Sequence, residues 1–223
     1  DGLDGRLATY RELGARFTKW RAVIGIGQGR PSLGAIAANA EALARFAGCS
    51  QAAGLVPIVE PEVLMDGDHP IQACEVATRA TLAEVFWALR RHRIHLAGML
   101  LKPNMVISGS DCPTQAPVAQ VARATVACLL DCVPASVPGI VFLSGGQSDV
   151  AATVHLNAMN QLGGVPWQLS FSYGRALQAP ALKAWKGQAA NAPAAQQAFL
   201  HRARLNSAAR TGSYTQDMEQ TPT

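Results

Sequence analysis

Charged residues, aromatic residues and long apolar runs are all scarce in this sequence of 223 residues. Charged residues make up 15% of the chain, against roughly 25% in a typical soluble domain. Hydrophobic residues make up 49%, which excludes an intrinsically disordered chain. Polar residues interrupt the uncharged stretch between 150 and 174, so we expect no membrane-spanning segment. The first residues lack the basic and apolar zones of a signal peptide, and we therefore expect a cytoplasmic protein.

Metal and nucleic-acid binding signals are also weak. The five cysteines have no repeated CxxC spacing, which argues against a disulfide framework or a zinc site and favours a reducing compartment. The net charge is only +4, and the one dense basic cluster, residues 90–93, falls at a predicted helix end, where cations are favourable next to the helix dipole. We therefore expect no metal ion, no other cofactor and no nucleic-acid partner.

Short apolar runs alternate with longer segments of helical spacing. The runs predict strands at residues 19–26, 55–60, 97–102, 139–143 and 168–172, buried on both faces of a parallel sheet. Helices are predicted over 31–53, 71–93, 116–132, 147–162, 177–185 and 194–209. We expect one domain over 1–209 and a mobile tail over 210–223. This alternation of strands and helices is compatible with two folds, a doubly wound sheet or part of a (β/α)8 barrel.

Polar residues gather near the strand ends, which distinguishes between these two folds. The carboxyl ends of parallel strands meet at one edge, and in barrel enzymes this edge holds the active site, with a phosphate often bound by the last two βα loops. We therefore favour the barrel. The residues expected at this edge are Lys19, Arg21, Glu60, Glu62, Lys102, Ser144, Gly145, Gly146, Ser172, Gly174 and Arg175.

Lys102 directly follows the apolar run AGMLL, so its amine is expected at the mouth of a dry interior. Desolvation and nearby cations such as Lys19 and Arg21 disfavour the charged form, and a neutral amine can attack a carbonyl carbon to form a Schiff base. The alternative, left open by the residues alone, is a lysine that reaches solvent or pairs with a carboxylate.

Glu60 and Glu62 stand two positions apart and are expected on the same side of an extended chain. Two close carboxylates do not both ionise freely, so one of them suits a group that donates and accepts protons. The alternative is that both form fixed ion pairs with Lys19, Arg21 or Lys102.

Two loops have the features of anion sites. FLSGGQS at 142–148 places two glycines and a hydroxyl between a strand and a helix, so that backbone N–H groups can approach an anion. SFSYGRALQ at 170–178 adds Arg175 as a forked donor to phosphate oxygens. Either loop alone is compatible with a tight turn, but together they favour a phosphorylated ligand.

Four segments, in this order, resemble those of class I fructose-bisphosphate aldolases: GLVPIVEPEVLMDGDH, LLKPNMV, GIVFLSGGQS and FSYGRALQAPALKAW. The resemblance covers nearly the whole chain. It implies a (β/α)8 barrel and a glycolytic and gluconeogenic lyase without a metal. This lyase cleaves fructose 1,6-bisphosphate to dihydroxyacetone phosphate and glyceraldehyde 3-phosphate through a lysine Schiff base. It also implies a homo-oligomer, tetrameric in the family.

The resemblance assigns a role to each predicted site residue. Lys102 matches the Schiff-base lysine, Glu60 the general acid/base and Glu62 its accompanying carboxylate. Lys19 and Arg21, in FTKWR, match basic residues near the reacting carbons and the substrate. The phosphate-binding loops are matched by Ser144, Gly145, Gly146, Ser172, Gly174 and Arg175.

Two features differ from the family pattern. Family members begin well before DGLDGR, with three further βα units that supply a catalytic Asp and more substrate contacts, so we expect this chain to hold the last five units of the barrel. Animal members also end in a Tyr that enters the active site, and we transfer no such role to Tyr214. Two hypotheses follow: most of a working aldolase, or a catalytically impaired fragment that serves as a phosphate-binding or assembly module.

Overall fold

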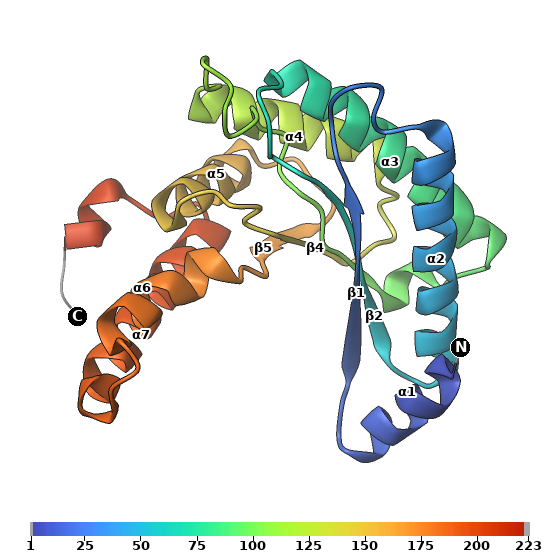
Figure 1. Ribbon diagram of the computed structural model, residues 1–223, viewed down its shortest axis with the longest axis horizontal. Coiled ribbons are helices and arrows are strands. Elements are labelled where there is room, and N and C mark those ends of the chain that lie inside the picture. Colours follow the sequence, from blue (N-terminus) through green and yellow to red (C-terminus); the bar gives the residue numbers. More distant parts are fainter. Residues whose placement is uncertain (1, 221–223) are drawn as a thin grey trace.

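The computed structural model describes residues 2–220 and contains a five-stranded parallel sheet in its centre (Figure 1). The strands lie in the order β1-β2-β3-β4-β5. Each predicted strand is confirmed, with shifts of a few residues at its ends. Their bounds are β1 Phe17–Ile24, β2 Val56–Val63, β3 Leu100–Leu101, β4 Gly139–Phe142 and β5 Gln168–Phe171.

A helix follows every strand, as the sequence predicts. The helices are α2 Leu33–Ala52, α3 Ile71–Arg91, α4 Val118–Cys132, α5 Asp149–Leu162, α6 Arg175–Trp185 and α7 Ala192–Arg210. The structure adds α1, Leu3–Glu12, whose mostly polar sequence buries only Leu7, and three short 3-10 helices, η1 Leu96–Gly98, η2 Ala189–Asn191 and η3 Gln216–Gln220. None of the helices in the described part of the chain is long and apolar enough to cross a membrane.

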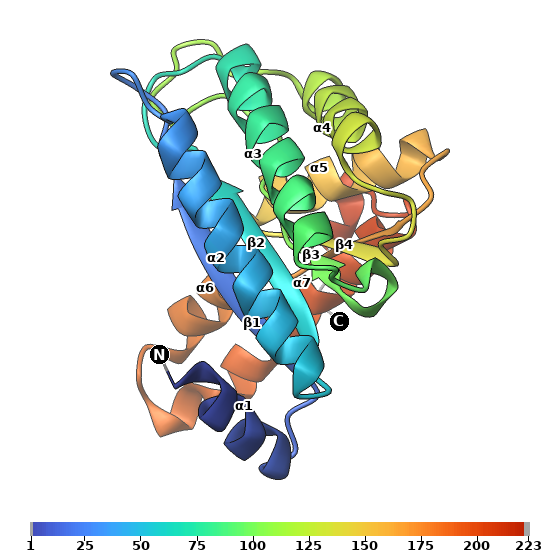
Figure 2. The same ribbon diagram turned by 90° about the vertical axis from the view of Figure 1, so that its right-hand side faces the viewer.

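The strand order decides how the sheet is wound. A doubly wound sheet needs a point at which the strand order reverses, but here each strand pairs with the next in sequence. Right-handed crossovers in a single direction place successive helices on the same face. Accordingly α2 packs against α3, α3 against α4 and α4 against α5 (Figure 2). The sequential order agrees with the barrel expectation and excludes the doubly wound alternative for these strands.

The strand β1 is buried on one face only, so the prediction of burial on both faces is wrong for it. Ala22 and Ile24 point into the core below α2, whereas Lys19, Arg21 and Val23 lie on the opposite, exposed face. The face that carries Lys19, Arg21 and Val23 is exposed because, among the described residues, β1 pairs only with β2 and no helix packs on that face.

The strand β2 extends three residues further than predicted, so Glu60 lies inside the strand rather than at its end, and Glu62 lies in the strand rather than beyond it. Pro61 has no backbone N–H to give to a neighbouring strand, and it bounds the apolar run that predicts this strand. Here β3 pairs with β2 only as far as Val59, so the missing N–H of Pro61 interrupts no ladder on that side. The strand therefore continues along β1 alone, from Glu60 to Val63.

The described part of the predicted mobile tail is packed against the rest of the chain. The side chain of Tyr214 is buried, and its backbone N–H donates to Oδ1 of Asn157 on α5 at 3.0 Å. Glu219 in η3 forms an ion pair with Arg202 on α7. These contacts bring Tyr214 and Glu219 against α5 and α7, and the mobility of the tail stays a prediction. Residues 221–223 lie outside the described residues.

Candidate active site

The strand ends that the sequence marked as polar lie side by side. Three backbone hydrogen bonds continue the sheet past its strands, with N···O distances of 2.8, 3.1 and 2.9 Å: Lys102 to Val59, Leu143 to Pro103, and Ser172 to Phe142. These bonds join the ends of β2, β3, β4 and β5 into one edge. The predicted site residues on these four strands therefore share the carboxyl edge of the sheet.

Glu60 lies between two lysines. Its Oε1 is 3.2 Å from Nζ of Lys102, and its Oε2 is 2.9 Å from Nζ of Lys19. The side chains of Glu60 and Lys102 are 4% and 11% exposed, whereas that of Lys19 is 42% exposed. The Lys19 contact lacks hydrogen-bond geometry, so the buried Oε2 has a charge partner but no hydrogen-bond donor. A proton acceptor is thus in direct contact with a nearly buried amine.

Glu62 forms an ion pair with a different basic residue, Arg21. Nε of Arg21, on β1, donates to its Oε2, and this hydrogen bond raises the pKa of the Arg21 guanidinium. The sequence left open whether the two carboxylates share protons or pair with cations. The structure shows the ion pairs, because the register places the cations of β1 diagonally across from the carboxylates of β2.

Asn104 is a positioning residue that the sequence analysis missed. Its Oδ1 accepts from the N–H of Val63, and its Nδ2 donates to Oγ1 of Thr78 and to the carbonyl of Met105, each at 3.0 Å. The side chain is buried. These bonds tie the chain just after Lys102 to the end of β2, which carries Glu60. A polar residue within the apolar run LLKPNMV was the available signal.

The two predicted anion loops meet. Gly145 and Gly146 have φ values of 61° and 99°, which are accessible mainly to glycine. A Cβ on Gly146 would lie 3.6 Å from a guanidinium nitrogen of Arg175 and 3.1 Å from Sδ of Met65. The side chain of Arg175 therefore reaches from the second loop to the first, next to the chain that leaves β2.

A pocket of about 390 Å³ opens between the starts of α5 and α6. Gln147, Ser148 and Arg175 are among its lining residues. Gly174 is the N-cap of α6, and Oγ of Ser148 caps α5 by accepting from the N–H of Ala151 at 3.1 Å. Two helix N-termini carry partial positive charge into this pocket, in addition to the guanidinium of Arg175. Ser144 is buried at the base of the first loop, and Ser172 stands at the start of the second.

His155 supports the first loop from behind, and the sequence analysis did not identify it. Its Nδ1 lies 2.6 Å from Oε1 of Gln147, whose amide nitrogen donates to the carbonyl of Ser144 at 3.0 Å. Burial lowers the pKa of His155 to about 4. The ring is therefore neutral near pH 7, and an N–H at Nδ1 donates to Gln147, which orients its amide group.

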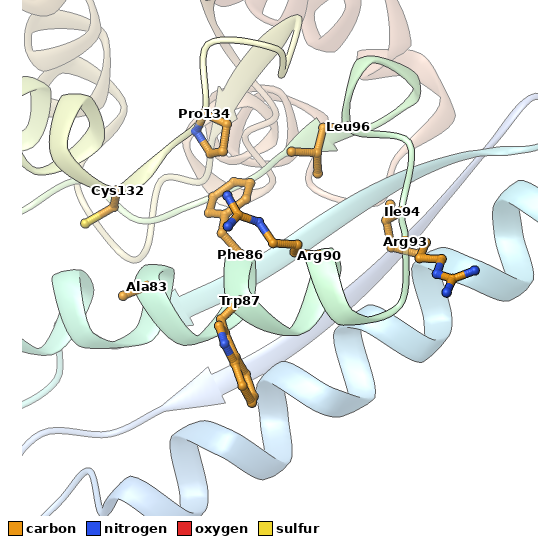
Figure 3. Close-up of a pocket in the computed structure, with 9 residues that line it drawn as sticks. All are labelled: Ala83, Phe86, Trp87, Arg90, Arg93, Ile94, Leu96, Cys132 and Pro134. Atoms are coloured by element: carbon orange, nitrogen blue, oxygen red, sulfur yellow. The ribbon is translucent and has the colours of Figure 1, made fainter.

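A second pocket, of about 480 Å³, lies where α3 and α4 end and the chain turns back toward β3 and β4, at the amino edge of the sheet (Figure 3). Phe86, Trp87 and Arg90 are among its lining residues. Beside it, the guanidinium of Arg91 stacks over Trp87 at 4.4 Å from the ring centroid. The basic cluster is at the end of a helix, as predicted.

Comparisons with known proteins identify the family to which the chain belongs. The family model described as "Glycolytic: Fructose-bisphosphate aldolase class-I" matches residues 1–223. The chain belongs to the class I fructose-bisphosphate aldolase family. It is 56% identical over 215 residues to a probable class 1 aldolase of Xanthomonas campestris, covering 96% of this chain and 64% of that protein.

Two further aldolases are also similar to this chain over part of their length. A cytosolic aldolase of Arabidopsis thaliana is 54% identical over 220 residues, covering 98% of this chain and 56% of that protein. A crystal structure of the Plasmodium falciparum aldolase, in complex with TRAP and a small molecule inhibitor, matches with a TM-score of 0.95 and 47% identity. That match covers 96% of this chain and 62% of the other. The chain thus spans less than two thirds of the length of these aldolases.

Proposed function

We propose that this chain carries the Schiff-base site of an aldolase that cleaves fructose 1,6-bisphosphate to dihydroxyacetone phosphate and glyceraldehyde 3-phosphate. The observation that carries the proposal is the contact of 3.2 Å between Nζ of Lys102 and Oε1 of Glu60 at the carboxyl edge of the sheet. Membership of the class I family supports it. A lysine amine and a proton acceptor in contact are the two groups that imine formation requires.

The first step moves a proton between Lys102 and Glu60, which form an ion pair. Transfer from the Lys102 ammonium to the Glu60 carboxylate gives a neutral amine and a carboxylic acid. The amine attacks C2 of the substrate, and the C–N bond forms as the carbonyl becomes a hydroxyl. Glu60 then returns its proton to that hydroxyl, which leaves as water, and a positively charged imine remains on Lys102.

The second step breaks the bond between C3 and C4. The imine accepts the electron pair of this bond and becomes an enamine, while the C4 hydroxyl loses its proton and becomes the aldehyde of glyceraldehyde 3-phosphate. We assign acceptance of that proton to Glu60, whose Oε2 has no hydrogen-bond donor. Lys19, whose Nζ lies 2.9 Å from Oε2 of Glu60, is assigned a place beside the reacting carbons. A proton added at C3 and water added at C2 then release dihydroxyacetone phosphate and free Lys102.

Substrate phosphate is assigned to the pocket between α5 and α6. The supporting features are the glycine pair 145–146, the guanidinium of Arg175 over Gly146, and the two helix N-termini. Ser144, Ser172 and Gly174 belong to the same two loops. Arg21, held by Glu62 on the face that carries Lys19, is assigned to the substrate as a further cation.

The larger assembly is also part of the proposal. We infer that the five βα units belong to a (β/α)8 barrel. The sequential strand order, and the position of β1 and β5 with one neighbouring strand each among the described residues, support this. The match to the Plasmodium falciparum aldolase, a longer chain, has a TM-score of 0.95 and also supports the barrel.

A cytoplasmic location is supported by the name of the Arabidopsis relative. The homo-oligomer remains a prediction.

Trapping the imine tests the assignment of Lys102. The chain is incubated with dihydroxyacetone phosphate and sodium borohydride, digested and mapped by mass spectrometry. We expect the label on Lys102 and none in Lys102→Arg, while Lys186→Arg, the matched control at an exposed lysine outside the pocket, labels like the unsubstituted chain. A label on Lys183 or Lys186 would overturn the assignment. Absence of any label would favour the non-catalytic module, which the names of the relatives do not favour.

A further inference from the structure

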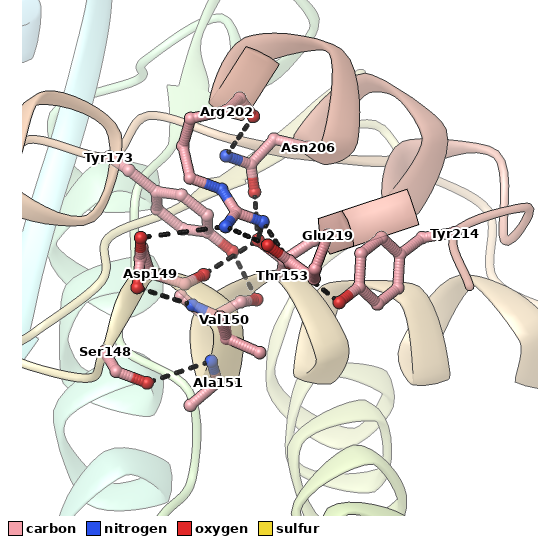
Figure 4. A network of polar contacts seen from close by, with 11 residues as sticks. Ser148, Asp149, Val150, Ala151, Thr153, Tyr173, Arg202, Asn206, Tyr214 and Glu219 are labelled. Carbon is pink, nitrogen blue, oxygen red and sulfur yellow. Dashed lines mark hydrogen bonds and ion pairs between the residues drawn. The ribbon is translucent and has the colours of Figure 1, made fainter. Parts of the chain in front are cut away.

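Arg202 on α7 is a buried cation that the proposed mechanism does not use. It is 3% exposed and lies between the first turns of α5 and the segment 211–220, at the centre of the polar network in Figure 4. A buried guanidinium is costly unless its charge and its donors are matched. Its surroundings therefore show which parts of the chain it holds together.

Two carboxylates from distant parts of the chain match its charge. Both terminal nitrogens of Arg202 donate to Glu219 of η3, at 2.9 and 2.7 Å, and Nη1 lies 3.6 Å from Oδ2 of Asp149. Nη2 also donates to Oγ1 of Thr153 at 3.0 Å. Asp149 is the first residue of α5, directly after the loop 144–148. Arg202 thus links the segment 211–220 to the start of the proposed phosphate pocket.

The second phosphate loop is attached at the same place. The hydroxyl of Tyr173 donates to the carbonyl of Ala152, in the first turn of α5, at 2.9 Å. Its ring is buried, and Figure 4 shows it beside Arg202. Burial raises the pKa of Tyr173, and the positive charge of Arg202 opposes that rise, as expected for two close groups. The loop 172–175 is therefore fastened to the helix turn that Arg202 holds.

The segment 211–220 is fixed at a second point. The backbone N–H of Tyr214 donates to Asn157 on α5, and its hydroxyl donates to Oε1 of Glu219 at 2.8 Å. Glu219 therefore receives hydrogen bonds from both Arg202 and Tyr214. Partial burial acts to raise the pKa of Glu219, but these hydrogen bonds and the charge of Arg202 together lower it. The carboxylate is held in its charged form against Arg202.

We propose that Arg202 is a positioning residue, which uses the docked Tyr214 and Glu219 to hold the loops 144–148 and 172–175 in the arrangement that binds phosphate. This inference rests on the phosphate site of the proposed function. Removal of Arg202 or of the Glu219 charge loosens the first turn of α5 at Asp149 and Thr153 and lets the two loops separate. The result is weaker phosphate binding without any lost contact between phosphate and a removed side chain.

The test compares Arg202→Met and Glu219→Gln with the unsubstituted chain and with Arg204→Met, an exposed arginine on the same helix. Affinity for inorganic phosphate is measured by calorimetry, at a temperature where circular dichroism shows every variant folded. We expect a loss of up to about a hundredfold in the first two variants, since a displacement of about 1 Å in a positioned group can have an effect of this order, and none in Arg204→Met. Equal affinity in all four proteins would overturn the inference and leave the phosphate site in place.

A second measurement separates positioning from general damage. Borohydride labelling of Lys102 is compared between dihydroxyacetone phosphate and dihydroxyacetone, which lacks the phosphate. We expect both variants to lose labelling with the phosphorylated ketone only. An equal loss with both ketones would show a merely structural role and overturn the inference. If the unsubstituted chain binds no phosphate, the phosphate site and the inference fail together, while labelling by dihydroxyacetone still tests the Schiff base by itself.

Discussion

Nζ of Lys102 lies 3.2 Å from Oε1 of Glu60, although the two residues belong to different βα units. Glu60 is in β2, and Lys102 directly follows β3. Val59 pairs with Leu101, so the residues that follow them, Glu60 and Lys102, lie opposite each other. Both side chains point to the face opposite the helices. Sheet register, rather than a local motif, therefore places the proton acceptor beside the amine.

Glu60→Gln is expected to slow labelling of Lys102 by dihydroxyacetone phosphate and borohydride by roughly a hundredfold or more, the usual contribution of a general acid or base. The amide retains the shape of the side chain but takes no proton from the ammonium. Labelling rates are compared at equal concentrations of folded protein, with the exposed Glu12→Gln as control. An unchanged rate in Glu60→Gln would mean that another group moves the proton.

Arg175→Ala is expected to weaken binding of the phosphorylated substrate by about tenfold to a hundredfold, since charge-assisted hydrogen bonds contribute roughly 1.5–3 kcal/mol. Mostly KM should rise, because Arg175 is exposed at the start of α6 and is not part of the core. Arg90→Ala, at the pocket on the amino edge, is the matched control. A comparable loss for an unphosphorylated fructose analogue would show that Arg175 does not bind phosphate.

Gly109→Ala is expected to destabilise the fold by roughly 2 kcal/mol or more, in the range of strained backbone substitutions. Its Cβ would lie 2.2 Å from the carbonyl oxygen of Gly67, so the loop that follows β2 would have to move. Gly34→Ala, in α2 with no atom within 4 Å of the added Cβ, is expected to stabilise by up to about 1 kcal/mol. Urea unfolding of both variants measures these opposite signs, and similar effects would contradict the steric argument.

We expect acidification to lower the stability of the folded chain because His155 is buried. Its pKa falls from 6.5 to about 4 on folding, so between these values the unfolded chain binds more protons than the folded one. Neutral His155 therefore contributes to the free energy of unfolding above the pKa of the unfolded chain. This contribution is lost as the pH falls toward the pKa of the folded chain, by about 2 kcal/mol between about pH 7 and about pH 5.

His155→Asn is expected to remove this part of the pH dependence, because an amide carries no titrating proton. Its N–H remains able to donate to Gln147, so the loop is retained. The difference between the two urea-unfolding free energies is measured at both pH values. A pH dependence that is identical in the two proteins would show that His155 does not make this contribution.

The sequence by itself determined the alternation of strands and helices and the chemistry available at the strand ends. Continuous apolar runs such as GIVFL and the 3.6-residue spacing of α3 follow from local burial, which depends on neighbouring residues in the chain. Lys102 and the glycine pair 145–146 were recognisable for the same reason. Each is a polar or conformationally special position directly beside an apolar run.

Only the tertiary structure decided which groups contact one another. The pairing of Lys19 and Lys102 with Glu60 depends on sheet register, and the continuation of β2 through Pro61 depends on where β3 ends. Asn104 and Arg202 join segments far apart in sequence, and His155 reaches back eight residues to Gln147; none of these side chains carries a local sign of its partner. The composition of the segment 211–220 gives no sign of the contacts that Tyr214 and Glu219 make, because their partners lie on α5 and α7.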